Sequence, residues 1–338
     1  MPEVKKPRSG SLQFWPRKRA KRIYPHFSTY PSSAFVGETA DKARLLAFAG
    51  YKATMLHVMA KDAAKGSATF GEEIRIPVTV LDCPAMVAVA VRAYKQTPYG
   101  MTIITEAWID KLPKELELGR KMGAKGKQNA STAFAAMEKD VASIVSLRVV
   151  AATQPIKSGV GKHKPELLEI EVGGKSAADR LAFAKQILGS EIRPGDVMKE
   201  GEVIDVIAIT KGKGTQGPMK RFGVVHQNRH AKHKVRHVGS LGQEQPGKVR
   251  WTVAMAGQLG FQQRTEHNKR VLKLGEAADA GKDVTPASGI NKYGMVRGPY
   301  VMLEGSVPGP KKRLVVMRVA IRPAKHKLLP YEIREIVR

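Results

Sequence analysis

The sequence has 338 residues, 42% of them hydrophobic and 26% charged, so it can bury a core and is not a disordered polymer, a collagen or a coiled coil. Its 58 lysines and arginines outnumber 30 aspartates and glutamates, and the net charge of +28 indicates a polyanionic partner, either a nucleic acid or an anionic membrane. The most apolar stretch, 78–91, contains Asp82 and Pro84 and is too short for a membrane span, while the single cysteine, Cys83, excludes internal disulfides.

The first 26 residues form a basic segment without hydrophobic periodicity. They contain eight lysines and arginines, one glutamate and four prolines, and such a composition cannot offset the entropy of ordering by itself. Phe14 and Trp15 lie beside the basic cluster 17–19, which favours an RNA-binding extension over a solvated tail. We therefore expect a basic extension over 1–35. The start of the chain lacks the apolar run of a signal peptide, so we expect a cytoplasmic protein.

The next region, 36–94, predicts one helix and several strands. Residues 41–50 begin with an aspartate suited to an N-cap and end at a glycine, which predicts a short helix. Alternating or β-branched residues predict strands, and Pro84 separates the last two of them. The strands expected here are 53–59, 74–81 and 86–91.

Residues 95–189 predict an α+β insertion. A helix is expected at 132–143, and a second at 177–188 is bounded by Ser176 as N-cap and Gly189 as stop signal. The other elements expected here are a Gly- and Lys-rich loop at 119–127 and strands at 144–151 and 167–172.

The β pattern resumes after residue 190. A turn is expected at 193–196, before the first strand of this region. The strands expected here are 202–209, 295–303 and 314–321, the last two separated by a Gly- and Pro-rich turn at 306–313. Many short strands with such turns predict a small β-barrel built from 36–94 and 190–338, so the fold class is mixed α/β and mainly β.

A second basic segment, 211–273, is expected to be a long loop within the barrel domain. It contains 14 lysines and arginines, two glutamates and five of the nine histidines. Together with the first 26 residues it carries +19 of the net charge of +28. This focused charge indicates phosphate contacts.

The same segment lacks a motif for catalysis. Residues 211–217 do not have the spacing of a nucleotide-binding P-loop. His226, His230, His233 and His237 are spaced as on one helix face, which suggests a metal site, but the interleaved cations and the absence of Cys, Asp or Glu favour RNA contact instead. We expect no metal, no cofactor and no enzymatic activity; an RNA-modifying or RNA-cleaving enzyme that uses these histidines is the alternative.

Trp251 also lies in the second basic segment. A tryptophan usually belongs to a core, but the flanking segments 243–247 and 254–260 lack the apolar residues needed to bury it. An aromatic residue at the tip of a basic loop is suited to stacking on a base, which is the role we predict.

Several motifs resemble one known family. They are ITKGKGTQGPMKR at 209–221, GSLG at 239–242, WTVAMAGQ at 251–258 and RTEHNKR at 264–270, with further similarity at 11–22, 73–94 and 305–313. The chain thus resembles the L-three (L3) family of large-subunit ribosomal proteins, and its length is similar to that of archaeal members. The resemblance implies a translation-protein β-barrel with long extensions into large-subunit ribosomal RNA (rRNA). It also implies a part in early subunit assembly and a loop near the peptidyl transferase centre.

The charge analysis and the resemblance together give the partners and the contact residues. The expected partner is large-subunit rRNA, with no membrane and no DNA, and the resemblance further implies neighbouring proteins of the L14 (L-fourteen) and L24 (L-twenty-four) type. The predicted RNA-binding residues are Trp15, Arg17, Lys18, Arg19, Lys21, Arg22, Lys211, Lys213, Lys220, Arg221, His226, Arg229, His230, Lys232, His233, Lys234, Arg236, His237, Lys248, Arg250, Trp251, Gln258, Arg264, His267, Lys269 and Arg270.

Overall fold

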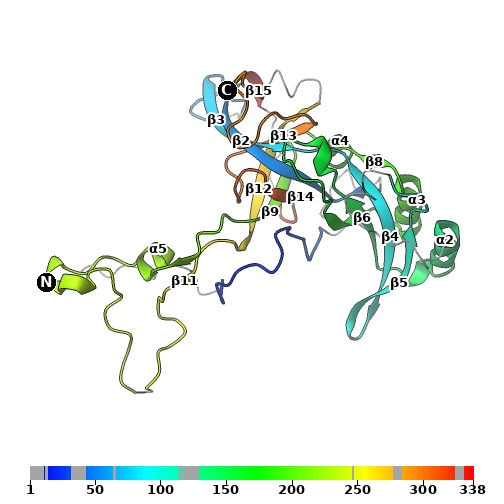
Figure 1. The fold of residues 1–338 in the computed structure, drawn as a ribbon. Helices are drawn as coiled ribbons and strands as arrows, with labels where there is room; N and C mark the ends of the chain where they lie inside the picture. Colours follow the sequence, from blue (N-terminus) through cyan, green and yellow to red (C-terminus); the bar gives the residue numbers. More distant parts are fainter. Residues whose placement is uncertain are drawn as a thin grey trace. The chain divides into compact units, whose positions relative to one another are not determined.

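The protein is mainly β, as predicted (Figure 1). The computed structural model describes residues 11, 14–31, 43–63, 66–113, 116, 129–245, 247–276, 284–323 and 331–338. The strands are β1 (Arg44–Leu45), β2 (Ala47–Lys61), β3 (Glu73–Asp82), β4 (Met86–Thr97), β5 (Gly100–Trp108), β6 (Ser146–Ala152), β7 (Leu167–Gly173), β8 (Glu191–Ile192), β9 (Val203–Ile209), β10 (Thr215–Gln216), β11 (Gly257–Gln258), β12 (Gln263–Gly275), β13 (Tyr300–Glu304), β14 (Leu314–Val319) and β15 (Glu332–Val337). The helices are α2 (Ala130–Lys139), α3 (Ala177–Ile187), α4 (Pro194–Val197) and α5 (Pro218–Phe222), with the 3-10 turns η3 (Val141–Ser143), η4 (Pro155–Lys157) and η5 (Arg229–Lys234).

The chain divides into two compact units. One comprises residues 1–23 and 209–264 and the other comprises 24–208 and 265–338. We call them the basic unit and the body, and each is described by itself.

The body contains two sheets. The first has the order β14-β9-β12-β13-β3-β2-β15, and β14 also pairs with β2, so six of its strands form a closed circuit of hydrogen bonds. The second has the order β1-β7-β6-β4-β5, with β8 paired to β4. Helices α2 and α3 contact the second sheet through β5, β6 and β7 (Figure 1).

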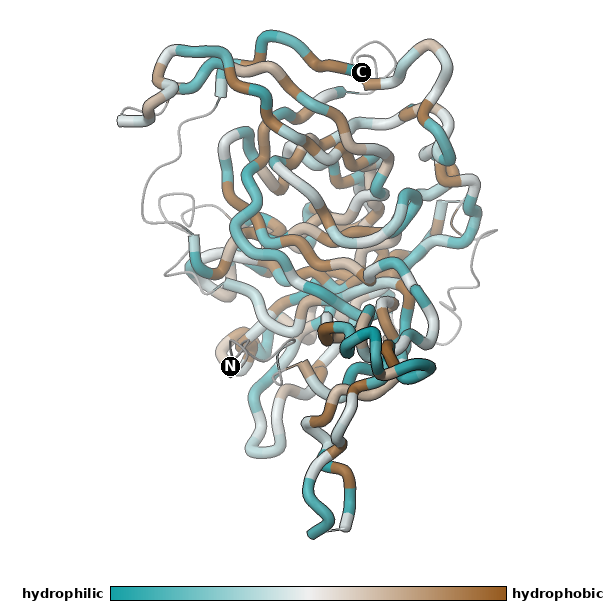
Figure 2. Tube along the Cα trace, turned by 90° about the vertical axis from the view of Figure 1, so that its left-hand side faces the viewer, coloured by the Kyte–Doolittle hydropathy of each residue, from teal (hydrophilic) through white to brown (hydrophobic). Residues whose placement is uncertain are grey.

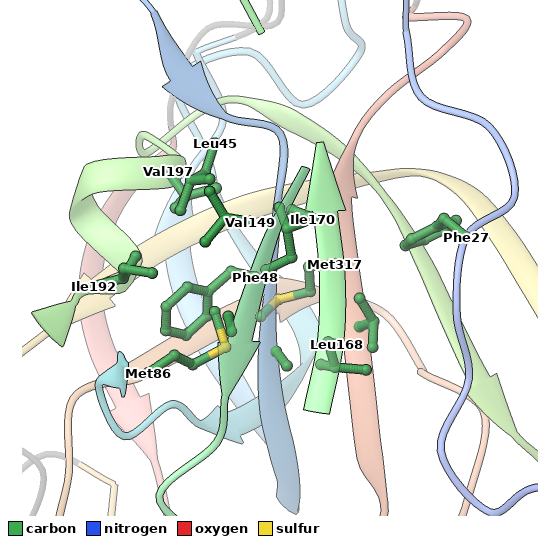
Figure 3. Packing of buried hydrophobic residues seen from close by; sticks show 14 of the residues in the cluster. Phe27, Leu45, Phe48, Met86, Val149, Leu168, Ile170, Ile192, Val197 and Met317 are labelled. Atoms are coloured by element: carbon green, nitrogen blue, oxygen red, sulfur yellow. The ribbon is translucent and has the colours of Figure 1, made fainter. Parts of the chain in front are cut away.

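The largest hydrophobic cluster contains residues of both sheets. Phe48 and Met317 come from the closed sheet, and Met86, Val149 and Ile170 come from the second (Figure 3). In the hydropathy view, short hydrophobic stretches alternate with hydrophilic ones along the trace of the body (Figure 2). Burial of apolar surface at about 25 cal/mol per Å² is the main source of its stability.

The helix predicted at 41–50 is wrong for the residues that are described. Residues 44–45 are β1, and β2 begins at Ala47 and runs through Gly50. The first eight residues of β2 are buried, and a short apolar run such as 45–49 does not by itself distinguish a buried strand from a helix. Gly50 is required for close packing, because a Cβ there would lie 2.4 Å from the Cys83 sulfur. Residues 41 and 42 lie outside the described residues.

Other predicted elements agree with the structure to different degrees. β3 and β4 confirm the strand pair separated by Pro84, and they belong to different sheets. The Ser176 hydroxyl accepts a hydrogen bond from the Asp179 amide at the start of α3. Gly189, with φ +82°, follows the end of the helix. Part of the prediction at 295–303 is wrong, since β13 begins only at Tyr300, and the predicted turn at 193–196 is the helical turn α4. The loop predicted at 119–127 lies outside the described residues.

A buried polar cluster joins loops to strands β2 and β3 of the closed sheet of the body. The Tyr293 hydroxyl donates to Asp82 Oδ2 at 2.7 Å, and the Gly159 amide donates to the same oxygen at 3.3 Å. Burial raises the pKa of the Asp82 carboxyl to about 6, although both hydrogen bonds oppose the shift. Nearby, Tyr51 Oη on β2 lies 2.8 Å from Glu166 Oε2.

Candidate nucleic-acid interface

The basic unit contains most of the predicted RNA-binding residues. Its sequence has 19 lysines and arginines, and its acidic residues are Glu3 and Glu244. Two carboxylates cannot neutralise this charge within the unit, so a compact basic unit needs external anions.

All of the predicted RNA-binding residues retain solvent exposure. Seven are half-buried, namely Trp15, Arg17, Arg221, Gln258, Arg264, Lys269 and Arg270, and the other 19 are exposed. The charged groups are therefore available for external contacts, except where protein groups engage them as described below.

The N-terminal extension packs against the long loop within the basic unit. The Trp15 ring stacks on Phe222 at the end of α5, with 5.8 Å between ring centroids and 17° between planes. Trp251 approaches the edge of Trp15 with centroids 5.7 Å apart, and the Arg17 guanidinium lies 4.2 Å from the centroid of Phe222. Aromatic pairs of this kind contribute about 0.5–1.5 kcal/mol each beyond burial.

Arg221 binds two other backbone segments of the same unit, 255–258 and the N-terminal extension at Arg17. Its guanidinium donates to the carbonyl oxygens of Gln258 at 3.0 Å, Met255 at 2.9 Å and Arg17 at 3.2 Å. The Arg17 side chain donates in return to the Arg221 carbonyl at 3.0 Å. Partial burial lowers the pKa of Arg221, but a guanidinium stays charged at neutral pH. Arg17 and Arg221 thus have a structural role in addition to the predicted contact with RNA.

Trp251 has a protein neighbour, yet 63% of its surface is exposed. It is not buried in a hydrophobic core, which agrees with the reasoning from its flanking sequence. The contact with Trp15 was not foreseen, because the two residues lie in distant parts of the sequence. Phe222 was also missed; its signal is an aromatic residue inside a basic segment.

The four histidines at 226–237 do not share a helix face. The 3-10 turn η5 contains a kink at Lys232, whose φ of 51° and ψ of −120° are not helical. A side-chain hydrogen bond from Gln227 to the His237 carbonyl closes the segment at 3.0 Å. Within the described ranges, no group of three or more His, Cys, Asp or Glu residues is arranged to hold a metal ion.

Residues 265–270 belong to the body and differ from the basic unit. The expectation that the long loop extends to residue 273 is corrected, because 263–275 form strand β12. His267 Nδ1 lies 3.1 Å from Asp205 Oδ2, and Lys269 Nζ lies 3.0 Å from Glu266. Arg270 lies 3.6 Å from Glu304 and over the Tyr331 ring. Each basic residue here has a carboxylate partner, so the segment carries little uncompensated charge.

Comparison with known proteins gives consistent relatives. The chain matches the model of the family described as ribosomal protein L3 over residues 1–336. The large ribosomal subunit protein uL3 of Methanopyrus kandleri is 48% identical over 324 residues, which are 95% of this chain and 87% of that protein. The proteins of the same name from Archaeoglobus fulgidus and Methanosphaera stadtmanae are 47% and 44% identical, covering 95% and 98% of this chain and 93% and 96% of their own lengths. None of the helices in the described ranges has the length and apolarity to cross a membrane.

Proposed function

Because this chain belongs to the ribosomal protein L3 family and is therefore a structural constituent of the large ribosomal subunit, we propose that its basic unit is the principal rRNA-binding surface. The observation that supports this assignment is the ratio of 19 basic to two acidic residues in that unit. The protein is not an enzyme, and the alternative of an RNA-modifying or RNA-cleaving enzyme has no support. As part of the ribosome it acts in the cytoplasm.

The domain organisation follows the same proposal. The closed circuit of strands supports a translation-protein β-barrel from 36–94 and 190–338, and the second sheet with α2 and α3 supports an α+β insertion over 95–189. β4 runs to Thr97, so the chain enters the second sheet before that insertion starts. We propose that segment 1–35 is the basic extension and that the long loop, expected over 211–273, ends where β12 begins at Gln263.

Further parts of the proposal rest on the family resemblance. They are a role in early subunit assembly, contacts with L14- and L24-type proteins, and the approach of the Trp251 loop to the peptidyl transferase centre. The exposure of Trp251 supports the last of these.

Binding to large-subunit rRNA should depend steeply on salt. If six to ten phosphates are neutralised, affinity falls by about 10³- to 10⁵-fold between about 50 and about 200 mM salt. The measurement is filter binding of the full chain, combined with a crosslinking map. Crosslinks should concentrate at 14–22 and 211–264; a map confined to the body would contradict the assignment.

Replacing Trp251 should affect RNA binding more than folding. For Trp251→Ala in the free protein we expect a loss of about 0.5–1.5 kcal/mol in the free energy of unfolding, from the contact with Trp15. A core tryptophan would cost about 3–5 kcal/mol. On RNA the loss should be about 1–3 kcal/mol, the scale of a base stack, and Trp251→Phe should retain part of it. Thermal unfolding and binding titrations measure the two effects. A large drop in the melting temperature of Trp251→Ala would contradict the prediction, because it is the result expected for a core residue.

A further inference from the structure

Asp205 is a buried carboxylate surrounded by hydrogen-bond donors of the body. It lies on β9 and has 0% exposure. Arg318 donates to its Oδ2 at 2.6 Å, and the Ile321 amide donates to the same oxygen at 3.3 Å. The Asn268 amide donates to Oδ1 at 3.1 Å. Burial alone would raise the pKa of Asp205, but these bonds together with that from His267 outweigh it and lower the pKa.

The ionised Asp205 carboxylate determines that Nδ1 of His267 faces it as a hydrogen-bond donor. An ionised carboxylate only accepts hydrogen bonds, so His267 Nδ1, 3.1 Å from Oδ2, carries a proton. The backbone next to His267 supports this arrangement. Asn268 adopts φ 57°, a left-handed conformation that asparagine tolerates, and its amide also donates a hydrogen bond to Asp205. In the neutral ring the other nitrogen, Nε2, is then an acceptor.

The imidazole is held at one end and open at the other. The side chain of His267 is 60% exposed while its partner is fully buried. The neighbouring cations Lys269 and Arg270 have carboxylates of the protein nearby, so this part of β12 is poorly suited to neutralising phosphates. His267 Nε2 is therefore an exposed acceptor of fixed orientation, and the cations beside it are already paired with carboxylates. Such a group is suited to accept a hydrogen bond from a neutral donor.

We infer that Asp205 is a positioning residue that presents Nε2 of His267 as an acceptor for a hydrogen-bond donor of rRNA, either a ribose 2′-hydroxyl or a base amino group. The inference rests on the proposed function, because it takes rRNA as the partner. It differs from the sequence expectation in its chemistry: His267 accepts a neutral hydrogen bond and does not neutralise a phosphate. RNA offers both kinds of donor along its minor groove and single-stranded loops.

Two substitutions separate this role from a structural one. His267→Asn keeps an amide donor near the position of Nδ1 and so preserves the bond to Asp205, but removes the outer acceptor. His267→Gln places an amide oxygen near the position of Nε2. We expect His267→Asn to weaken rRNA binding by about threefold to tenfold, the scale of one hydrogen bond, with His267→Gln closer to the wild type. The salt slope should not change, because a neutral contact releases no counterion.

The controls distinguish the possible failures. His163→Asn, an exposed histidine elsewhere in the body, should bind like the wild type. Equal binding by His267→Asn and the wild type, or a salt slope reduced by about one, would overturn the inference while leaving the proposed function intact. No rRNA binding by the wild type would overturn both. Nitrogen chemical shifts of His267 in the free full chain should show protonated Nδ1 and unprotonated Nε2, and the opposite tautomer would also overturn it.

The source of the donor is identified with modified RNA. If the donor is a ribose hydroxyl, a single 2′-deoxy substitution in the rRNA should weaken binding of the wild type as much as His267→Asn does. The same RNA substitution should not weaken binding of the His267→Asn variant further. If no such position exists, replacement of base amino groups should reproduce the loss. Failure of both kinds of substitution to reproduce the loss would overturn the inference.

Discussion

Replacing Arg318 by methionine should lower the free energy of unfolding by about 3–5 kcal/mol, because it leaves a buried carboxylate without its charged partner. Arg318 has 4% exposure and Asp205 has none. The same guanidinium donates to the Thr29 carbonyl at 2.6 Å and lies 4.2 Å from the centroid of the Phe27 ring, so both contacts are lost as well. Urea unfolding at neutral pH measures the effect.

The matched control is an exposed ion pair of the same body. Arg334 pairs with Glu73, and their side chains are 52% and 48% exposed. Arg334→Met should therefore cost less than about 1 kcal/mol. If Arg318→Met proves too unstable to measure, Arg318→Lys should give an intermediate loss, because an ammonium cannot reproduce the bonds to both Asp205 and Thr29. Equal effects at Arg318 and Arg334 would contradict the assigned role of the buried pair.

The effect of Arg318→Met should also depend on pH. The folded pKa of Asp205 lies below its unfolded value, so the pair stabilises the protein above an unfolded pKa of about 4 and this contribution is lost as pH falls through the lower folded value. In the variant, loss of the Arg318 bond moves the pKa of Asp205 upward from its wild-type folded value and favours the protonated form. The difference between the wild type and Arg318→Met should thus be large at neutral pH and small in acid.

Local signals in the sequence predict the ends of α3 and the break between β3 and β4. Ser176 and Gly189 bound α3 because capping and a positive φ are properties of single residues. Pro84 separates β3 from β4 because proline cannot donate within a sheet. The prediction at 41–50 failed because the same local signals, an aspartate before and a glycine after an apolar run, also occur in a buried strand.

Contacts between distant segments could not be predicted in this way. The pairing of β14 with β2 joins residues more than 260 positions apart, and no periodicity within either strand reveals its partner. Arg221 binds backbone carbonyls, which every residue has, so its role leaves no pattern of residue types. The location of the charge was visible in the sequence. The structure was needed to show which cations, such as Lys269 and Arg270, have carboxylate partners in the protein.

Replacing four cations of 229–236, which we call the η5 segment because it contains η5 and the two residues after it, by glutamine should have the largest effect on rRNA binding. All four are exposed, and the hydrogen bonds from Gln227 to the His237 carbonyl and from the His230 amide to Asn228 are unchanged. Among the replaced cations, Arg236 Nη1 lies 3.5 Å from His226 Nε2, an exposed contact at the limit of a hydrogen bond. Folding stability should therefore stay within about 0.5 kcal/mol of the wild type. If each cation neutralises one phosphate, affinity should fall by about 100- to 1,000-fold and the salt slope by about three. The residues replaced are Arg229, Lys232, Lys234 and Arg236.

A control variant that removes the same charge from the body distinguishes local phosphate contacts from the effect of the protein's net charge. Four cations of the body that are exposed provide it: Lys95, Lys157, Lys185 and Arg334. Their replacement by glutamine removes the same charge, and three of them already have carboxylate partners in the protein. We expect this control to change the salt slope by less than about one, since screening at about 0.15 M salt limits unpaired surface charges to a range of about 8 Å. Equal losses in the two variants would mean that net charge alone drives binding, and an unchanged slope in the η5 variant would place the phosphate contacts elsewhere in the chain.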